Sequence, residues 1–182
     1  MMDTTLVTMT STPLSTREIL ELNGVFLLKR PMINPVRIDF ANGAFYRGET
    51  NTDGLCHGWG EILYTNDTVI AGEWINGVLC GKGVYMSKEM TYKGDFRNNA
   101  FHGKGRQTYH SDGETYTGGF ANGERGGHGK VSWPSGSYYT GLWKDGLMNG
   151  LGSMCAQGKI YSGYWTDGCQ HKGGLVSEYT VA

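Results

Sequence analysis

The chain has 182 residues, of which 38% are hydrophobic and 18% are charged, and its formal net charge is -1. No apolar run reaches the length of a membrane span, and the basic residues are interspersed with acidic ones, which argues against a nucleic-acid partner. Glycine takes 30 positions, about twice the usual share of roughly 7%, and these glycines recur in register, which indicates a structural role.

Residues 1–36 stand apart from the rest of the sequence. Ser15 and Glu18 have the spacing of a capping box and predict a short helix, and the apolar run Val25–Leu28 predicts a strand. We interpret this segment as an N-terminal cap for a repeat array. Its first residues show no secretory or mitochondrial signal, and the four cysteines form no C-x-x-C pair, so we expect a reduced, cytoplasmic location.

A five-residue phrase then returns at a nearly fixed interval. It consists of a Tyr (once an Ile), any residue, Gly, any residue, and Phe or Trp, and a weaker first copy is Tyr46-Arg-Gly48. The lead positions are 46, 70, 92, 116, 139 and 161, so the steps are 24, 22, 24, 23 and 22 residues. A fixed period of this length predicts a repeat architecture, in which function lies on a repeated surface instead of in one pocket.

Each unit is predicted to be a β-hairpin. Tight-turn pairs follow the phrase in every full copy, and the returning strands alternate larger and smaller side chains. The turn pairs are Asn76-Gly77, Asn98-Asn99, Asn122-Gly123, Asp145-Gly146 and Asp167-Gly168. Since a single hairpin is marginal in water, the units must stack, with about 9–10 Å per repeat.

The predicted fold class is therefore all-β, an elongated single-layer antiparallel sheet with a short N-terminal helix and strand cap. We expect a half repeat at 37–45 and about six units starting near the six lead positions, so that the array spans 37–174 and leaves a tail at 175–182. The truncated sixth unit should expose an edge strand, which predicts possible end-to-end self-association.

The repeated pattern Tyr-x-Gly-x-Phe/Trp-x-Asn-Gly-x-x-His-Gly-x-Gly resembles the MORN (membrane occupation and recognition nexus) repeat. The copy from Tyr92 to Gly105 matches it best, and the resemblance covers about three quarters of the chain. The resemblance implies a scaffold at the cytoskeleton, at cilia or at membranes, with a partner segment along the concave face of the sheet.

An aromatic ladder is the most informative candidate site. Lead and fifth positions lie on one face of each strand, and the glycine between them leaves room for rings to lie flat over the backbone. These rings are expected to form two stacked rows. The ladder residues are Trp74, Tyr92, Phe96, Tyr116, Phe120, Tyr139, Trp143, Tyr161 and Trp165. One interpretation makes them the core of a one-layer sheet, another leaves part of this face open as a groove for a partner, and the two are compatible.

No motif predicts catalysis, a cofactor or a metal. His57, Cys80, His102 and His171 share one repeat position, but neighbouring copies lie about 9–10 Å apart, too far for one zinc ion with ligands at about 2.0–2.3 Å. We expect these side chains to bond the neighbouring turn instead. Gly129-Lys130 lacks the first glycine and the hydroxyl residue of a phosphate-binding loop.

The sequence therefore predicts a non-enzymatic scaffold that docks a helix or extended peptide of another protein within a cytoskeletal, ciliary or axonemal assembly. The alternative is a peripheral membrane adaptor that binds phospholipid, which a mild excess of cations between Lys82 and Arg106 favours. An enzyme would enter only as a separate partner chain.

Overall fold

The computed structural model describes residues 32, 34–171 and 179–180. The predicted helix and strand of the N-terminal cap lie outside these residues. The described residues contain no helix and form one long antiparallel sheet. The all-β prediction is confirmed.

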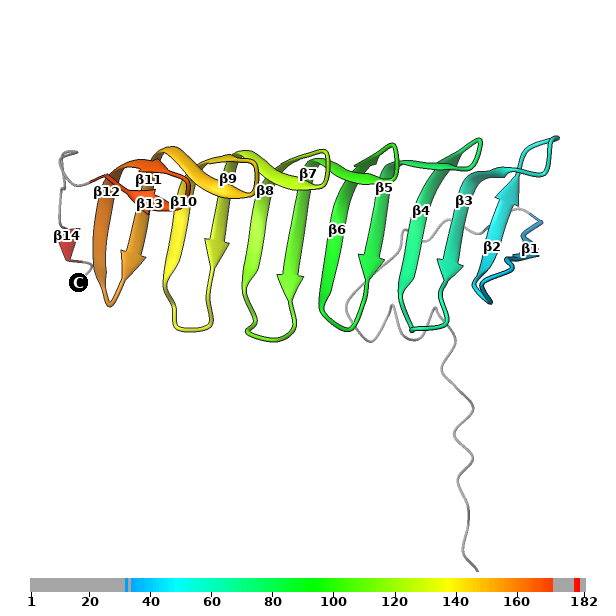
Figure 1. The fold of residues 1–182 in the computed structure, drawn as a ribbon, viewed down its shortest axis with the longest axis horizontal. Helices are drawn as coiled ribbons and strands as arrows, with labels where there is room; N and C mark the ends of the chain where they lie inside the picture. Colours follow the sequence, from blue (N-terminus) through cyan, green and yellow to red (C-terminus); the bar gives the residue numbers. More distant parts are fainter. Residues whose placement is uncertain (1–31, 33, 172–178, 181–182) are drawn as a thin grey trace, which may run out of the picture.

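The sheet of the described residues has fourteen strands. Strands β1 to β13 follow one another across it in chain order, and β14 pairs with β12 (Figure 1). Their bounds are β1 Val36–Asp39, β2 Phe45–Thr50, β3 Cys56–Leu63, β4 Val69–Ile75, β5 Val78–Met86, β6 Met90–Arg97, β7 Ala100–Tyr109, β8 Thr115–Ala121, β9 Glu124–Ser132, β10 Tyr138–Lys144, β11 Leu147–Ala156, β12 Lys159–Thr166, β13 Cys169–Gln170 and β14 Tyr179–Thr180. Because each strand pairs only with its sequence neighbours up to β13, the array is an open, elongated ladder of hairpins.

The tight turns have the backbone that the sequence predicts. In the turn between β6 and β7, Asn98 and Asn99 have φ values of 51° and 63°, which residues other than Gly, Asn and Asp rarely adopt. Each tight turn is also tied to the unit before it by a backbone hydrogen bond. The donors and acceptors are Gly77 to Cys56, Asn99 to Leu79, Gly123 to Phe101, Gly146 to Arg125 and Gly168 to Met148, at 2.8–3.1 Å.

The hairpins are not flat. Between the pairings Gly72↔Gly83 and Trp74↔Leu79, the returning strand β5 uses more residues than the lead strand β4. Such a bulge bends the strand, and Gly81 takes up the bend with a φ of 85°. The tight-turn ends therefore curl out of the plane of the long hairpin arms and overlap along one edge of the molecule (Figure 1).

The last strand of the array is partly covered. β14 pairs with Lys159 and Ile160 at one end of β12, and β13 pairs with Trp165 and Thr166 at the other. The expected exposed edge is thus confined to the middle of β12, and self-association through it stays a prediction. Within the described residues, no helix has the length and apolar character needed to cross a membrane.

Candidate interaction surface

One row of glycines crosses the sheet from β2 to β12. Each strand contributes one glycine, and every glycine is the direct register partner of the next. The row reads Gly48, Gly60, Gly72, Gly83, Gly94, Gly105, Gly118, Gly129, Gly141, Gly152 and Gly163. We call the face on which the aromatic ladder covers this row the ring face, and the other the opposite face.

Tyrosine rings lie directly over the glycine row. A Cβ added at Gly129 would be 2.2 Å from the hydroxyl oxygen of Tyr116, and one added at Gly105 would be 2.5 Å from that of Tyr92. Only hydrogen atoms fit beneath the rings, so the prediction that glycine leaves room for them is confirmed. Each hydroxyl then donates to the carbonyl of the residue after the row glycine, for example Tyr116 to Gly119 at 2.9 Å and Tyr92 to Asp95 at 2.8 Å.

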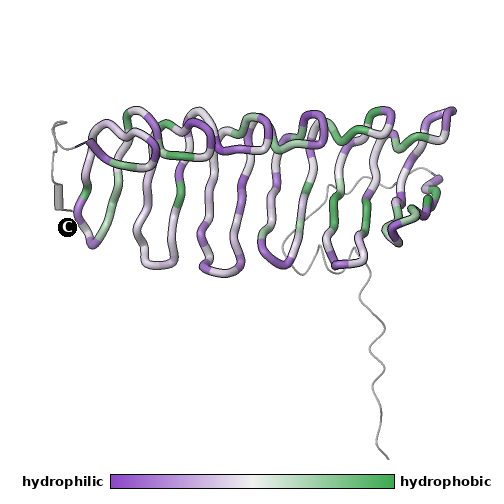
Figure 2. The backbone as a smooth tube through the Cα atoms, in the orientation of Figure 1, coloured by the Kyte–Doolittle hydropathy of each residue, from purple (hydrophilic) through white to green (hydrophobic). Residues whose placement is uncertain are grey.

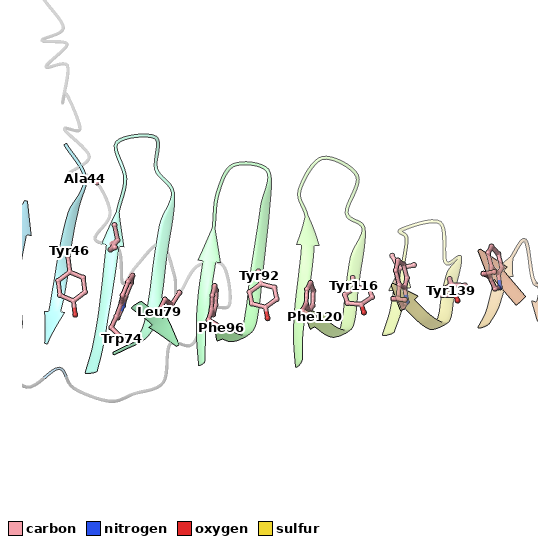
Figure 3. Close-up of a cluster of buried hydrophobic side chains, with 13 residues drawn as sticks. Ala44, Tyr46, Trp74, Leu79, Tyr92, Phe96, Tyr116, Phe120 and Tyr139 are labelled. Atoms are coloured by element: carbon pink, nitrogen blue, oxygen red, sulfur yellow. The ribbon is translucent and has the colours of Figure 1, made fainter. Parts of the chain in front are cut away.

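The rings meet edge to face, and the expectation of stacked rows is wrong. Tyr116 lies 5.1 Å from Phe120 of its own unit and 5.0 Å from Trp143 of the next, with interplanar angles of 89° and 79°. This geometry places the positive edge of one ring on the negative face of another. Tyr92, Tyr116 and Tyr139 each touch a ring of the next unit, so the contacts form one line from β6 to β12 (Figure 3).

The burial of the ladder rings tests whether they form the core of the sheet or an open groove. Tyr92, Tyr116 and Tyr139 are fully buried, as is Tyr46 of the weaker first copy. The other buried ladder rings are Trp74, Phe96, Phe120, Trp143 and Trp165, which are 4–7% exposed. Tyr161 is half-buried and contacts no other ring of the described residues. The ladder is the core of the sheet (Figure 3), and the part that a partner could reach consists mostly of other side chains.

The tyrosines are covered by the residue that precedes the histidine position of each unit. Phe101 stacks on Tyr92 with 3.8 Å between ring centroids and an interplanar angle of 12°. In the second unit Ile70 replaces the lead tyrosine, and the buried Leu79 fills the space over the glycine row, with its Cδ1 2.9 Å from a Cβ added at Gly72. Sequence reasoning missed this position because its residue type changes from unit to unit.

In the fourth unit the covering residue is an arginine. The Arg125 guanidinium lies 4.8 Å from the Tyr116 ring centroid and 2.6 Å from a Glu114 oxygen. Glu114 also accepts a 2.8 Å hydrogen bond from the Trp133 indole, and Gln107 accepts two from Arg125 at 3.1 Å. This half-buried charge is therefore paired and hydrogen-bonded, as burial requires, and it interrupts an otherwise apolar cover.

Apolar side chains that are only half-buried line the ring face over its length. They pack against the ring core on one side and face solvent on the other. We call this set the docking strip. Its members are Ile38, Cys56, Ile70, Tyr85, Phe101, Trp133, Met148 and Met154. A half-exposed apolar surface of this kind is typical of a protein-interaction site.

The ring face has little acid–base reactivity at neutral pH. Burial raises the pKa of Tyr116 to about 12, an effect that the Arg125 charge partly offsets, and it raises the pKa of Tyr92 further. Both hydroxyls therefore stay protonated and act as hydrogen-bond donors. Burial likewise raises the pKa of the Cys56 thiol, which disfavours the reactive thiolate.

At three copies of the histidine position, the side chain makes a hydrogen bond within the sheet. His57 Nδ1 lies 3.3 Å from Asn76 Oδ1 in the tight turn of the next unit, as expected, and Asn149 bonds the corresponding turn residue Asp167 at 3.4 Å. His171 instead bonds Thr166 of its own hairpin at 2.6 Å. Among the described residues, no three His, Cys, Asp or Glu side chains gather where they could hold a metal ion.

Two known proteins resemble parts of this chain. The inactive protein tyrosine kinase pTKL of Plasmodium berghei (strain Anka) is 45% identical over 47 residues, which cover 26% of this chain and 4% of that protein. A solved structure, the SAS-4 (dCPAP) TCP domain in complex with a proline-rich motif of Ana2 (dSTIL) of Drosophila melanogaster, has a TM-score of 0.42 and 15% identity, covering 76% of this chain and 84% of that one.

The family model of the MORN repeat matches four consecutive stretches, at residues 71–88, 92–114, 116–138 and 139–159. These stretches contain the hairpins from β4 to β11, in which the glycine row and the ring contacts repeat most regularly. The match confirms the resemblance that the sequence motif predicts. Over these stretches the hairpins of the sheet resemble consecutive MORN repeats.

Proposed function

We propose that this chain is a non-enzymatic scaffold whose docking strip binds a helix or an extended peptide of another protein. MORN repeats act as protein- or membrane-interaction modules. The observation that carries the proposal is the strip itself, because its half-exposed apolar side chains run from β1 to β11 on a rigid ring core. A partner segment lying across the strands would bury these side chains at little conformational cost to the scaffold.

The strip has the chemistry of a protein contact. Tyr85, Phe101 and Trp133 offer ring surface, and Met148 and Met154 offer adaptable thioethers, and aromatic and Met side chains are enriched in protein interfaces. The Arg125–Glu114 pair lies between these apolar groups. It would fix the register of a partner that carries a polar residue there.

A matched pair of substitutions tests the strip. Met148 belongs to the docking strip, whereas its neighbour Leu147 is 46% exposed and lies outside it. We expect Met148→Asp to reduce partner recovery in pull-downs at least about tenfold, and Leu147→Asp to leave it unchanged. Thermal unfolding of both variants checks that they remain folded. Equal recovery of partners by both folded variants would rule the strip out.

We further propose that the partner assembly is cytoskeletal, ciliary or axonemal, which rests on the MORN resemblance. Proximity labelling in ciliated cells, followed by mass spectrometry, tests this placement. Enrichment of ciliary or axonemal proteins by the wild-type chain, and its loss in Met148→Asp, is the expected outcome. Labelling of proteins from other compartments alone would contradict it.

A peripheral membrane adaptor is the second candidate, and it has less support. Of the cations between Lys82 and Arg106, Lys82 forms an ion pair with Asp95, and Lys88 lies 3.8 Å from Asp67. These pairs reduce the positive potential available to anionic lipid, and stable membrane attachment normally requires more than one weak signal. Flotation with anionic vesicles at low and physiological salt separates the two candidates.

A further inference from the structure

We propose that the opposite face of β7–β9 binds a phosphoryl group carried by a side chain of a protein partner. The cations of the site lie on the other side of the sheet from the docking strip, and Trp133, in the linker after β9, borders both surfaces. Its two cations are Arg106 on β7 and Lys130 on β9, and Thr117 on β8 lies between them in direct register with both. All three residues are exposed.

Strand geometry lets both cations reach one anion. Arg106, Thr117 and Lys130 each follow or precede a row glycine, so their side chains leave the sheet on the face away from the rings. Arg106 and Lys130 are two strand spacings apart, about 9–10 Å between their Cα atoms. Lys130 Nζ lies 4.2 Å from the Tyr138 ring centroid on β10, so its flexible side chain must turn toward β8 to meet Arg106 over Thr117. The Thr117 hydroxyl can then donate from below.

The sheet is hollowed at this place. A depression of about 350 Å³ is lined by the two cations, by the hydroxyl residues Thr115, Thr117 and Ser132, and by Trp133 and Pro134 of the adjoining linker. Hydroxyl and cationic donors together are what a phosphoryl oxygen needs, and the linker residues give one wall an apolar character.

The charges of the site are not balanced within the described part of the chain. No described carboxylate lies within ion-pair distance of Arg106 or Lys130. Glu114, the acidic residue nearest in sequence to Thr115, is turned to the ring face, where it holds Arg125 and Trp133. Lys93 is the register partner of Arg106 on β6, and its pKa is lowered by burial and by the Arg106 charge.

The surroundings favour a protein ligand over a lipid surface. The large hydrophobic residues that are well exposed in the described structure all lie outside β7–β9. No well-exposed large hydrophobic side chain of these strands could therefore insert into a bilayer, as membrane attachment requires in addition to charge. A compact site with two cations and a row of hydroxyls instead matches a single dianionic group such as phosphoserine.

An NMR titration of the uniformly ¹⁵N-labelled full chain tests the site. The probe is a short glycine-flanked phosphoserine peptide, and the comparison is the same peptide without phosphate. We expect saturable shifts of the Thr115, Thr117 and Ser132 amides with the phosphorylated peptide only. Shifts that are equal for both peptides, or that do not saturate, would overturn the proposal.

Charge variants assign the binding to the two cations. Arg106→Gln and Lys130→Gln should each weaken binding about tenfold or more, whereas Lys82→Gln, which removes an opposite-face cation already paired with Asp95, should not. A weakening by Lys82→Gln equal to that of Lys130→Gln would show a diffuse charge effect and overturn the site. A vesicle assay tests lipid as the ligand instead, with phosphatidylcholine vesicles that contain a phosphoinositide. The proposal would also be overturned if the chain floated with these vesicles only when both cations were present and the phosphopeptide caused no shifts.

Discussion

The two faces of this sheet share one backbone but follow different rules. On the ring face, every unit from β6 to β11 repeats the same tyrosine over the same pair of glycines, joined by edge-to-face contacts. On the opposite face, the residues beside the row glycines change along the array. They are the apolar Ala71 and Val84 on β4 and β5, and the polar Arg106, Thr117 and Lys130 on β7 to β9.

Figure 2 shows hydrophobic residues concentrated in the hairpin of β3 and β4, and hydrophilic residues along β7 and β8. The difference teaches where the repeat is constrained. The ring face builds most of the packing of this single-layer sheet, so that face admits little variation. The opposite face packs a smaller cluster of Val69, Val84 and Met86 at β4 and β5. Over β7–β9 its polar residues beside the row glycines are exposed, and this difference between units suits it to specific recognition.

The largest expected effect comes from filling the glycine row. In Gly129→Ala, the new methyl group would lie 2.2 Å from the Tyr116 hydroxyl oxygen and 2.4 Å from its Cζ. The ring must move, and the edge-to-face contacts on both sides are lost with it. We expect the free energy of unfolding to fall by about 3 kcal/mol or more, measured by urea unfolding.

Gly126→Ala is the matched control, in the same strand. A Cβ there would meet nothing closer than Ala121 Cβ at 3.7 Å, and its stability should remain within about 1 kcal/mol of wild type. If the two variants lost equal stability, the glycine row would be no more sensitive to a methyl group than Gly126 is. The ring face would then not be the constrained face.

A smaller effect is expected from removing one hydroxyl. Tyr116→Phe keeps the ring but loses the 2.9 Å hydrogen bond to the Gly119 carbonyl, and should cost about 1 kcal/mol. Tyr138→Phe is the counterpart on the opposite face, because the Tyr138 hydroxyl has no hydrogen-bond partner among the described residues and Lys130 packs on its ring. We expect that variant to unfold at the same urea concentration as wild type, and a larger loss for Tyr138→Phe would count against the contrast.

Much of the ring face could be predicted from the sequence because its physics is periodic. The turn pair Asn98-Asn99 and the glycine beneath each ring leave a signal in every copy. The sequence does not, however, separate the roles of neighbouring glycines. Gly81, which bends the strand, and Gly83, which seats a ring, look alike in a sequence although one needs a positive φ and the other an empty volume.

The covering residues and the cation pair on the opposite face could not be predicted from the sequence, because neither follows a repeated residue pattern. Leu79, Phe101 and Arg125 occupy one structural position with three unrelated side chains, so no residue type marks it. Arg106 and Lys130 are 24 positions apart in the sequence, where Arg106 ends the mild excess of cations from Lys82 and Lys130 belongs to a failed phosphate-loop match. Only the register through Thr117 brings them to one place.

The smallest effect should come from a buried carboxyl group on the opposite face. Glu61 is 7% exposed and is the register partner of both Arg47 and Ala71. Burial raises its pKa, and the Arg47 charge only partly offsets this. The unfolded chain then releases the Glu61 proton more readily than the native state, so stability falls as the pH rises from about 4.3, the usual glutamate value, through the raised native pKa.

Glu61→Gln removes this loss. The variant should be more stable than wild type at pH 7, and the difference should shrink and vanish below about pH 4, where the carboxyl is protonated in both states. Urea unfolding between pH 3 and pH 8 measures this difference, and Glu124→Gln, which alters an exposed carboxylate at the start of β9, is the control. A Glu61→Gln difference that is independent of pH would point to altered packing. It would also mean that this part of the opposite face is constrained by shape, as the ring face is.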